Sequence, residues 1–148
     1  MIEVKERLNV SAKDFFSKIE ESVIYDIEKS TGKKLVPRDI YNGFKYTKNL
    51  KNKLGRRGEV DVIITHFVSP KLYGANFKSA MGINTIYYNI EEVDDENIDV
   101  IYKEEFIGKT NSMDLNFKIM NFFYKKRSKK RAIRLIKSIE TYIKSNKE

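Results

Sequence analysis

The stretch Ile2-Glu3-Val4-Lys5-Glu6-Arg7-Leu8-Asn9-Val10-Ser11-Ala12-Lys13-Asp14-Phe15-Phe16 changes its periodicity partway along. Up to residue 10, apolar side chains fall at even positions and alternate with polar ones, and Glu6 is the one break in phase. A period of two over this length predicts a half-buried β-strand. Beyond residue 11 the apolar side chains recur at helical spacing. The chain therefore opens with a strand that runs directly into a helix.

The residues that flank this first helix predict where it begins and ends. The Ser11 hydroxyl can accept a hydrogen bond from the first free amides, and Asp14 suits the positive end of the helix. Gly32 is a typical residue just beyond a helix C-terminus. The apolar residues of the helix share one face: Phe16, Ile19, Val23 and Ile27. Pro37 can open a short second helix that Gly43 ends.

The middle of the chain consists of strands separated by short turns. Apolar residues alternate with polar ones over 44–50, 60–68, 73–77, 86–90 and 98–106. Short connections require antiparallel pairing, because parallel neighbours need a crossover of a dozen or more residues. Beyond Gly108 the apolar residues again recur at helical spacing. This predicts a long C-terminal helix with Asn111 or Ser112 as its cap. We therefore predict an α+β fold in a single domain, residues 1–148, with an antiparallel curved sheet of six or seven strands gripping that helix.

The composition excludes several classes of protein. The chain has no Cys and one His, so disulfides, thiolate zinc sites and cysteine nucleophiles are ruled out, and we expect no metal and no cofactor. The N-terminus has no apolar signal core, which predicts a cytoplasmic protein. The most apolar stretch, 113–124, is short and carries polar residues, so no transmembrane segment is expected.

The chain resembles the START-like superfamily, also called SRPBCC or helix-grip proteins. The resemblance lies in the opening strand and the junction over residues 8–16, where an apolar strand meets a small residue and a helix with a bulky apolar pair. Residues 22–35 and 43–47, and Phe122-Phe123-Tyr124 before a basic run, are similar to an uncharacterised bacterial branch of that superfamily. These are core and surface patterns rather than catalytic signatures, and no catalytic residue can be carried over.

The resemblance implies a cavity between the concave face of the sheet and the C-terminal helix that holds an apolar or amphipathic ligand. Tyr suits such a cavity because its ring is apolar and its hydroxyl gives a directed hydrogen bond. The alternative is that these aromatic side chains simply fill the core. By phase, the candidates for the cavity are Phe44, Tyr46, His66, Tyr73, Phe77, Tyr88, Tyr102, Glu104, Met120 and Phe123.

Two of these candidates also suggest an enzyme. His66 and Glu104 are in phase with the apolar residues of their strands, so each could face inward and either satisfy the other or act as acid and base, as in START-like cyclases or dehydratases. A bulge in either strand would reverse the direction of the side chain. A structural or exposed His66 is the alternative, and a non-enzymatic ligand-binding protein is the function that we expect.

The basic residues suggest a second function. Between Ser112 and Glu148 lie eleven Lys or Arg and three Asp or Glu, which accounts for the whole net charge of +8. Within this segment six basic residues fall among seven: Lys125, Lys126, Arg127, Lys129, Lys130 and Arg131. Such a cluster could dock on nucleic acid, a membrane surface or an acidic protein. The alternative is a solvated helix face.

Overall fold

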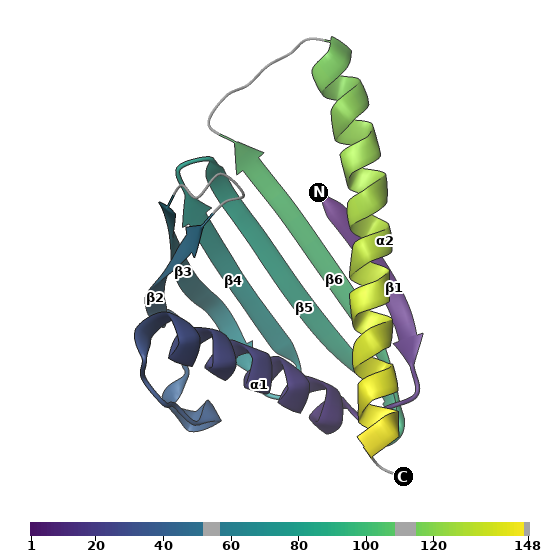
Figure 1. The fold of residues 1–148 in the computed structure, drawn as a ribbon. Coiled ribbons are helices and arrows are strands. Elements are labelled where there is room, and N and C mark those ends of the chain that lie inside the picture. The colour runs from purple at the N-terminus through teal and green to yellow at the C-terminus, as the bar shows by residue number, and fades with distance from the viewer. Residues whose placement is uncertain (52–56, 109–114, 147–148) are drawn as a thin grey trace.

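The computed structural model describes residues 1–51, 57–108 and 115–146 of the chain; within these ranges the side chains of residues 50, 51, 57 and 115–124 are outside the description. The elements follow one another in the order that the sequence predicts, strand, helix, strands and helix (Figure 1). Their bounds are β1 Ile2–Leu8, α1 Ala12–Thr31, η1 Pro37–Asp39, β2 Lys45–Lys51, β3 Arg57–Val68, β4 Leu72–Ser79, β5 Gly82–Asp94, β6 Asn97–Gly108 and α2 Leu115–Asn146.

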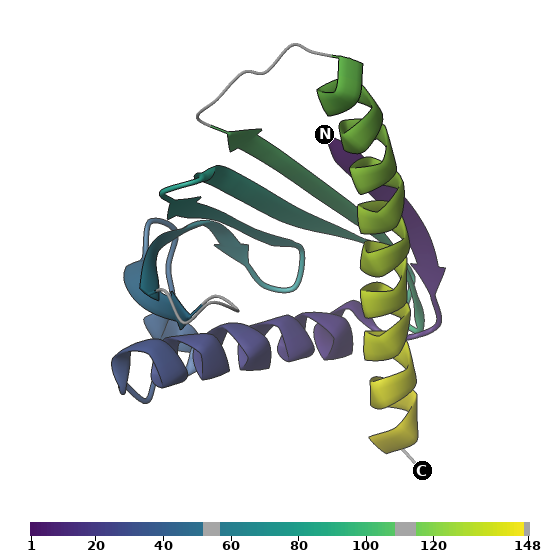
Figure 2. The ribbon, with the colours of Figure 1, turned by 45° about the horizontal axis from the view of Figure 1, so that its top comes forward.

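The described strands form one six-stranded antiparallel sheet in the order β1-β6-β5-β4-β3-β2. Strands β2 to β6 are a meander, since each pairs with the next along the chain. The first strand pairs with the last, with Val4 opposite Tyr102. The predicted α+β fold with a curved antiparallel sheet is therefore confirmed, and Figure 2 shows the curvature of the sheet above α1.

Both predicted ends of α1 are confirmed. The Ser11 hydroxyl accepts a hydrogen bond from the Asp14 amide at 3.1 Å, and Gly32 adopts the left-handed conformation with φ 77° while its amide donates to Glu28 O. The inner face of α1 carries Phe15 and Phe16, which are fully buried. The short second helix opens at Pro37 as predicted, but it is the three-residue η1, which ends at Asp39 and not at Gly43. Its 3₁₀ turn starts at Pro37, whose fixed φ suits a first turn.

The long helix α2 lies along β1 and touches α1 (Figures 1 and 2). Its described buried residues are Ser128, Ala132, Ile136 and Ile143, which recur at helical spacing along one side. The proposed caps of this helix at Asn111 or Ser112 lie outside the described residues. None of the helices in the described part of the chain has an apolar segment long enough to cross a membrane.

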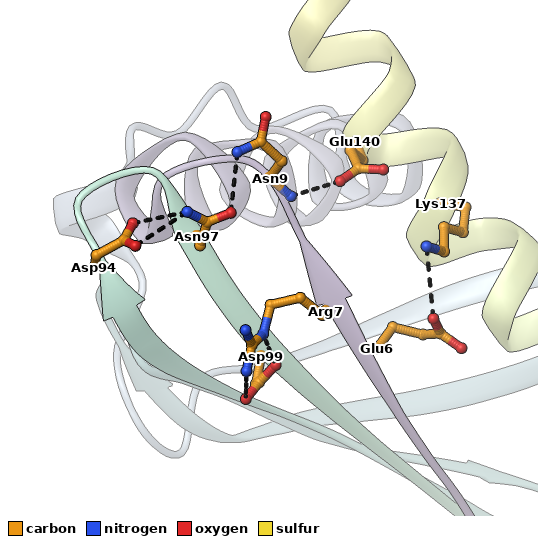
Figure 3. Close-up of polar contacts among 8 residues, drawn as sticks. All are labelled: Glu6, Arg7, Asn9, Asp94, Asn97, Asp99, Lys137 and Glu140. Atoms are coloured by element: carbon orange, nitrogen blue, oxygen red, sulfur yellow. Dashed lines mark hydrogen bonds and ion pairs between the residues drawn. The ribbon is translucent and has the colours of Figure 1, made fainter.

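Polar contacts fasten the C-terminal half of α2 to the rest of the fold (Figure 3). Glu140 accepts a hydrogen bond of 2.6 Å from the backbone amide of Asn9, at the junction of β1 and α1. Glu6, which breaks the apolar alternation, keeps the inward phase of β1 and pairs with Lys137 at 3.7 Å. On the other side of β1, Arg7 pairs with Asp99 of β6. The contacts of Glu140 and Lys137 fix where α2 crosses the edge of the sheet, whereas the Arg7–Asp99 pair joins β1 to β6.

Candidate functional site

A half-open cleft of about 320 Å³ lies between α1, the concave face of the sheet and one side of α2. We call it the α1 cleft, because α1 supplies more of its wall than α2 does. Its lining comes from α1, β2, β4, β5 and α2. The residues are Lys18, Ile19, Ser22, Val23, Asp26, Tyr46, Lys48, Tyr73, Phe77, Ile86, Tyr88, Leu135 and Ile139.

A charged group closes the end of the α1 cleft next to β2. The Tyr46 hydroxyl donates a hydrogen bond of 2.5 Å to Asp26 Oδ2. The Lys48 ammonium lies 3.1 Å from both oxygens of the same carboxylate and 5.6 Å from the centre of the Phe77 ring. Residues 46 and 48 are on the same face of β2, because side chains alternate along a strand. Asp26 therefore balances the charge of Lys48 and accepts from both neighbours.

Two tyrosines form the floor of the α1 cleft. Tyr73 of β4 and Tyr88 of β5 are directly paired across the two strands, with ring centroids 6.2 Å apart. Their exposed fractions are 6% and 7%. Within the described residues neither hydroxyl has a hydrogen-bond partner, although both residues line the cleft. The ring centroids of Tyr88 and Tyr102 of β6 are 4.9 Å apart, so the aromatic floor continues beyond the cleft.

Burial keeps these phenols protonated. It raises the pKa of Tyr88 to about 12, and the nearby Glu104 carboxylate adds to the effect. Burial also raises the pKa of Tyr73, with further contributions from Tyr88 and Asp26. The pKa of Tyr46 is raised by burial first and then by its hydrogen bond to Asp26. At neutral pH all three side chains are uncharged hydroxyls that can donate a hydrogen bond.

Apart from Lys18 and Ser22 of α1, the rest of the wall is apolar. Ile19 and Val23 of α1 face Ile86 of β5 and Phe77 of β4 across the cleft. At its mouth stands Leu135 of α2, which is 50% exposed. A half-exposed Leu at the rim of an apolar cleft can bury further surface when a molecule enters. The arrangement joins an apolar chamber to one polar end.

Four of the ten predicted cavity residues line the α1 cleft: Tyr46, Tyr73, Phe77 and Tyr88. Phe44 instead packs between Tyr41 and Tyr46. Tyr102 is buried beside Tyr88 and donates a hydrogen bond of 3.0 Å to Glu104, so that carboxylate is on the inner face with a partner. The side chains of Met120 and Phe123 lie outside the described residues.

The inward orientation of His66 was predicted wrongly. The pairing of β3 with β4 shifts between Ile64 and His66, which is a β-bulge. The bulge reverses the alternation, so His66 is exposed on the outer face beside Thr65 and Tyr87. Because Glu104 is on the inner face, the two side chains cannot meet as an acid–base pair. Within the described residues no three His, Cys, Asp or Glu side chains form a group that could hold a metal ion.

The contribution of α1 to the cleft was not predicted from the sequence. The unpredicted lining residues include Lys18, Ser22 and Asp26 of α1 and Lys48 of β2. A signal was present, because Asp26 follows Ile19 and Val23 at spacings of seven and three. One carboxylate on an otherwise apolar helix stripe indicates a buried partner or a polar site.

The basic run lies on the solvent side of α2. Lys125 is half-buried, while Lys126, Arg127, Lys129, Lys130 and Arg131 are exposed. Ser128, in the middle of the run, is buried, and Arg131 donates a hydrogen bond to its hydroxyl at 3.3 Å. Across the described ranges none of these six cations forms an ion pair. The positive charge of the run is therefore not neutralised within the described part of the chain.

Solved structures with the same fold share little sequence with this chain. A protein of unknown function from Staphylococcus aureus has a TM-score of 0.63 at 12% identity, over 99% of this chain and 96% of its own. Ara h 8.0201 has a TM-score of 0.61 at 12% identity, over 97% of both chains. A START superfamily protein from Mycobacterium smegmatis has a TM-score of 0.58 at 10% identity, over 97% of both chains. At such identities the likeness shows the fold alone.

The six-stranded sheet, the crossing of α2 and these structural neighbours define a START-like fold of the helix-grip class. The resemblance found in the sequence is thereby confirmed. Within that class, the chain belongs to the family described as "Domain of unknown function (DUF3284)", whose profile matches residues 2–125. No curated protein sequence matches the chain.

Proposed function

We propose that this protein binds a small, mainly apolar molecule in the α1 cleft. The observation that carries the proposal is the cleft itself, about 320 Å³ with mainly apolar walls and a charged pair at its β2 end. Small-molecule sites in proteins range from about 300 to 1,000 Å³, so the ligand has the size of one or two fused rings or a short chain. The START-like fold supports the same function by analogy, which is a weaker argument than the cleft.

Affinity would come mainly from burial of the apolar surface of the ligand, at about 25 cal/mol per Å² before the cost of ordering. Ile19, Val23 and Ile86 are placed to supply that contact. The Asp26–Lys48 pair at the β2 end and the tyrosines of the floor would orient the molecule. Leu135 at the mouth would cover it.

Native mass spectrometry of the purified chain tests the proposal directly. We expect an additional mass that disappears under denaturing conditions, or a rise in melting temperature with an added apolar probe such as naphthalene. Leu135→Trp should fill the mouth of the cleft and abolish both signals. Arg134→Trp is the matched control, since residue 134 is exposed on the same helix and does not line the cleft. If Leu135→Trp binds as the unmodified chain does, the cleft is not the site.

A second candidate function is docking of α2 on an anionic partner. The specific observation is that Lys126, Arg127, Lys129, Lys130 and Arg131 are exposed and have no ion pair within the described residues. Attraction of this kind is long-ranged and falls steeply with ionic strength. It does not compete with the first function, because the basic residues do not line the α1 cleft.

A further inference from the structure

The polar groups of the α1 cleft differ in whether they are free to contact a ligand. Tyr46 and Lys48 both donate to the carboxylate of Asp26. Lys18, at the mouth, lies 3.2 Å from Glu21 and 4.7 Å from the centre of the Tyr142 ring. Each cation lining the cleft is therefore paired with an acidic residue of the chain. A ligand with a net charge would have to break one of these pairs or enter without a counter-ion, and burial of an unpaired charge is costly.

Two buried side chains, Tyr73 and Tyr88, and the exposed Ser22 are the lining residues whose hydroxyls have no partner within the described residues. Each tyrosine side chain is more than nine-tenths buried. Neither tyrosine hydroxyl is among the fully buried side-chain atoms without a partner, so these groups open into the cleft and not into the packed core. A hydrogen bond between such a hydroxyl and a ligand contributes a net free energy of about 0.5–1.5 kcal/mol. Since both residues line the α1 cleft, a molecule in the cleft is the natural partner.

The geometry of the pair indicates which chemical group fits. The two residues are opposite each other on adjacent strands, their rings are 6.2 Å apart and inclined by 35°, and both face the same cleft. Their hydroxyls stay protonated, so both are donors at neutral pH. Two donors side by side match the two lone pairs of one carbonyl oxygen. The other hydroxyls of the cleft are less suited, because Tyr46 is already bound to Asp26 and Ser22 is exposed on α1.

We propose that the α1 cleft takes a neutral, mainly apolar molecule with a carbonyl-type oxygen, which accepts hydrogen bonds from the hydroxyls of Tyr73 and Tyr88. This inference rests on the proposed function, since it names the ligand class of the same cleft. The apolar part of the molecule would lie against Ile19, Val23 and Ile86. The Asp26–Lys48 pair would stay intact and close the polar end.

Matched probes separate the two proposals. We would measure binding to the full chain by equilibrium dialysis with 2-acetylnaphthalene, a neutral ketone, and with 2-isopropenylnaphthalene, in which a methylene group replaces the carbonyl oxygen. The ketone should bind about tenfold more tightly than the alkene, the effect of one or two net hydrogen bonds. The anionic 2-naphthoate should bind more weakly than the ketone.

Variants then assign the difference to the two hydroxyls. In the double variant Tyr73→Phe, Tyr88→Phe the affinity for the ketone should fall to that for the alkene. The affinity for the alkene should stay the same as in the unmodified chain. Tyr102→Phe is the matched control: it removes a buried hydroxyl on the next strand that does not line the α1 cleft, and it should leave the preference unchanged. If the double variant does not fold, the two single variants should each show a partial loss.

Each result decides between the proposals. Equal binding of ketone and alkene to the unmodified chain would overturn the hydrogen-bonding inference and leave the proposed function standing. Tighter binding of naphthoate would overturn it in favour of an acidic ligand. A preference that survives in the double variant would also overturn it. If the alkene and the ketone both fail to bind and no copurified mass is found, the proposed function itself fails.

Discussion

The hydroxyl of Tyr46 on β2 lies 2.5 Å from the carboxylate of Asp26 on α1, twenty residues earlier in the chain. This hydrogen bond joins the edge of the sheet to the helix that covers it. Lys48 contacts the same carboxylate from the next inward position of β2. The polar end of the α1 cleft is thus also a structural connection between β2 and α1.

Tyr46→Phe should destabilise the protein by about 1–3 kcal/mol, because it removes a hydrogen bond to a charged acceptor in a partly buried site. Urea denaturation measures the change in the free energy of unfolding. Tyr41→Phe is the control, since Tyr41 is 61% exposed and should change stability by less than about 0.5 kcal/mol. Equal effects of the two substitutions would show that the bond to Asp26 contributes nothing.

Stability should fall at high pH because of Tyr88. An unfolded chain loses this proton near 10.0, whereas burial raises the pKa in the folded protein to about 12. Between these values the unfolded state binds fewer protons than the native state, so the contribution is present below pH 10.0 and is lost as pH rises through about 12. Tyr88→Phe should make the fall in the free energy of unfolding between about pH 9 and pH 12 smaller by roughly 2 kcal/mol, as measured by urea denaturation. Identical pH profiles for the two proteins would contradict this.

Gly74→Ala should destabilise the sheet by about 1–3 kcal/mol through overpacking. A Cβ at this position would lie 2.8 Å from Thr65 Oγ1 and 2.9 Å from His66 Nδ1, on the outer face at the bulge of β3. Truncation of Thr65 and His66 to Ala should relieve much of the penalty, which a double-mutant cycle measures by urea denaturation. If Gly74→Ala destabilises the protein equally when Thr65 and His66 are both Ala, contact with these two side chains is not the cause.

Glu140→Ala should loosen the C-terminal part of α2. The carboxylate accepts the Asn9 amide at 2.6 Å, and the helix crosses β1 at this point (Figure 3). Hydrogen exchange of the amides after residue 136 should become faster, since local opening then costs less free energy. Lys144→Ala is the control on the same helix, because Lys144 is exposed and has no ion pair within the described residues. Unchanged exchange in Glu140→Ala would argue that apolar packing alone holds α2.

Substitution of Gln for Lys126, Arg127, Lys129 and Lys130 should lower the salt concentration at which the protein elutes from heparin, with stability changed by less than about 0.5 kcal/mol. The matched control replaces four exposed lysines elsewhere, Lys33, Lys34, Lys71 and Lys78, and removes the same charge. Elution of the two variants at the same salt concentration would show that only net charge matters. That result would remove α2 as a specific docking surface.

The local patterns of the sequence were sufficient for the elements. The alternation of Ile2, Val4 and Leu8, the Ser11 cap and the Gly32 stop predicted β1 and α1 correctly, because strand period and helix caps depend on neighbours within a few residues. The short turns between later strands predicted antiparallel pairing. The same alternation also placed Tyr73, Phe77 and Tyr88 on the inner face.

Only the tertiary structure decided how these elements make a cleft. The pairing of β1 with β6 joins residues about a hundred positions apart, and no local pattern encodes it. The bulge at His66 inserts one residue into β3 and turns a predicted inward side chain outward. Asp26 meets Tyr46 and Lys48 only after α1 has packed across the sheet. The sequence by itself thus determined which side of each element is apolar, whereas the site depends on long-range packing, which brings together side chains that share no local periodicity.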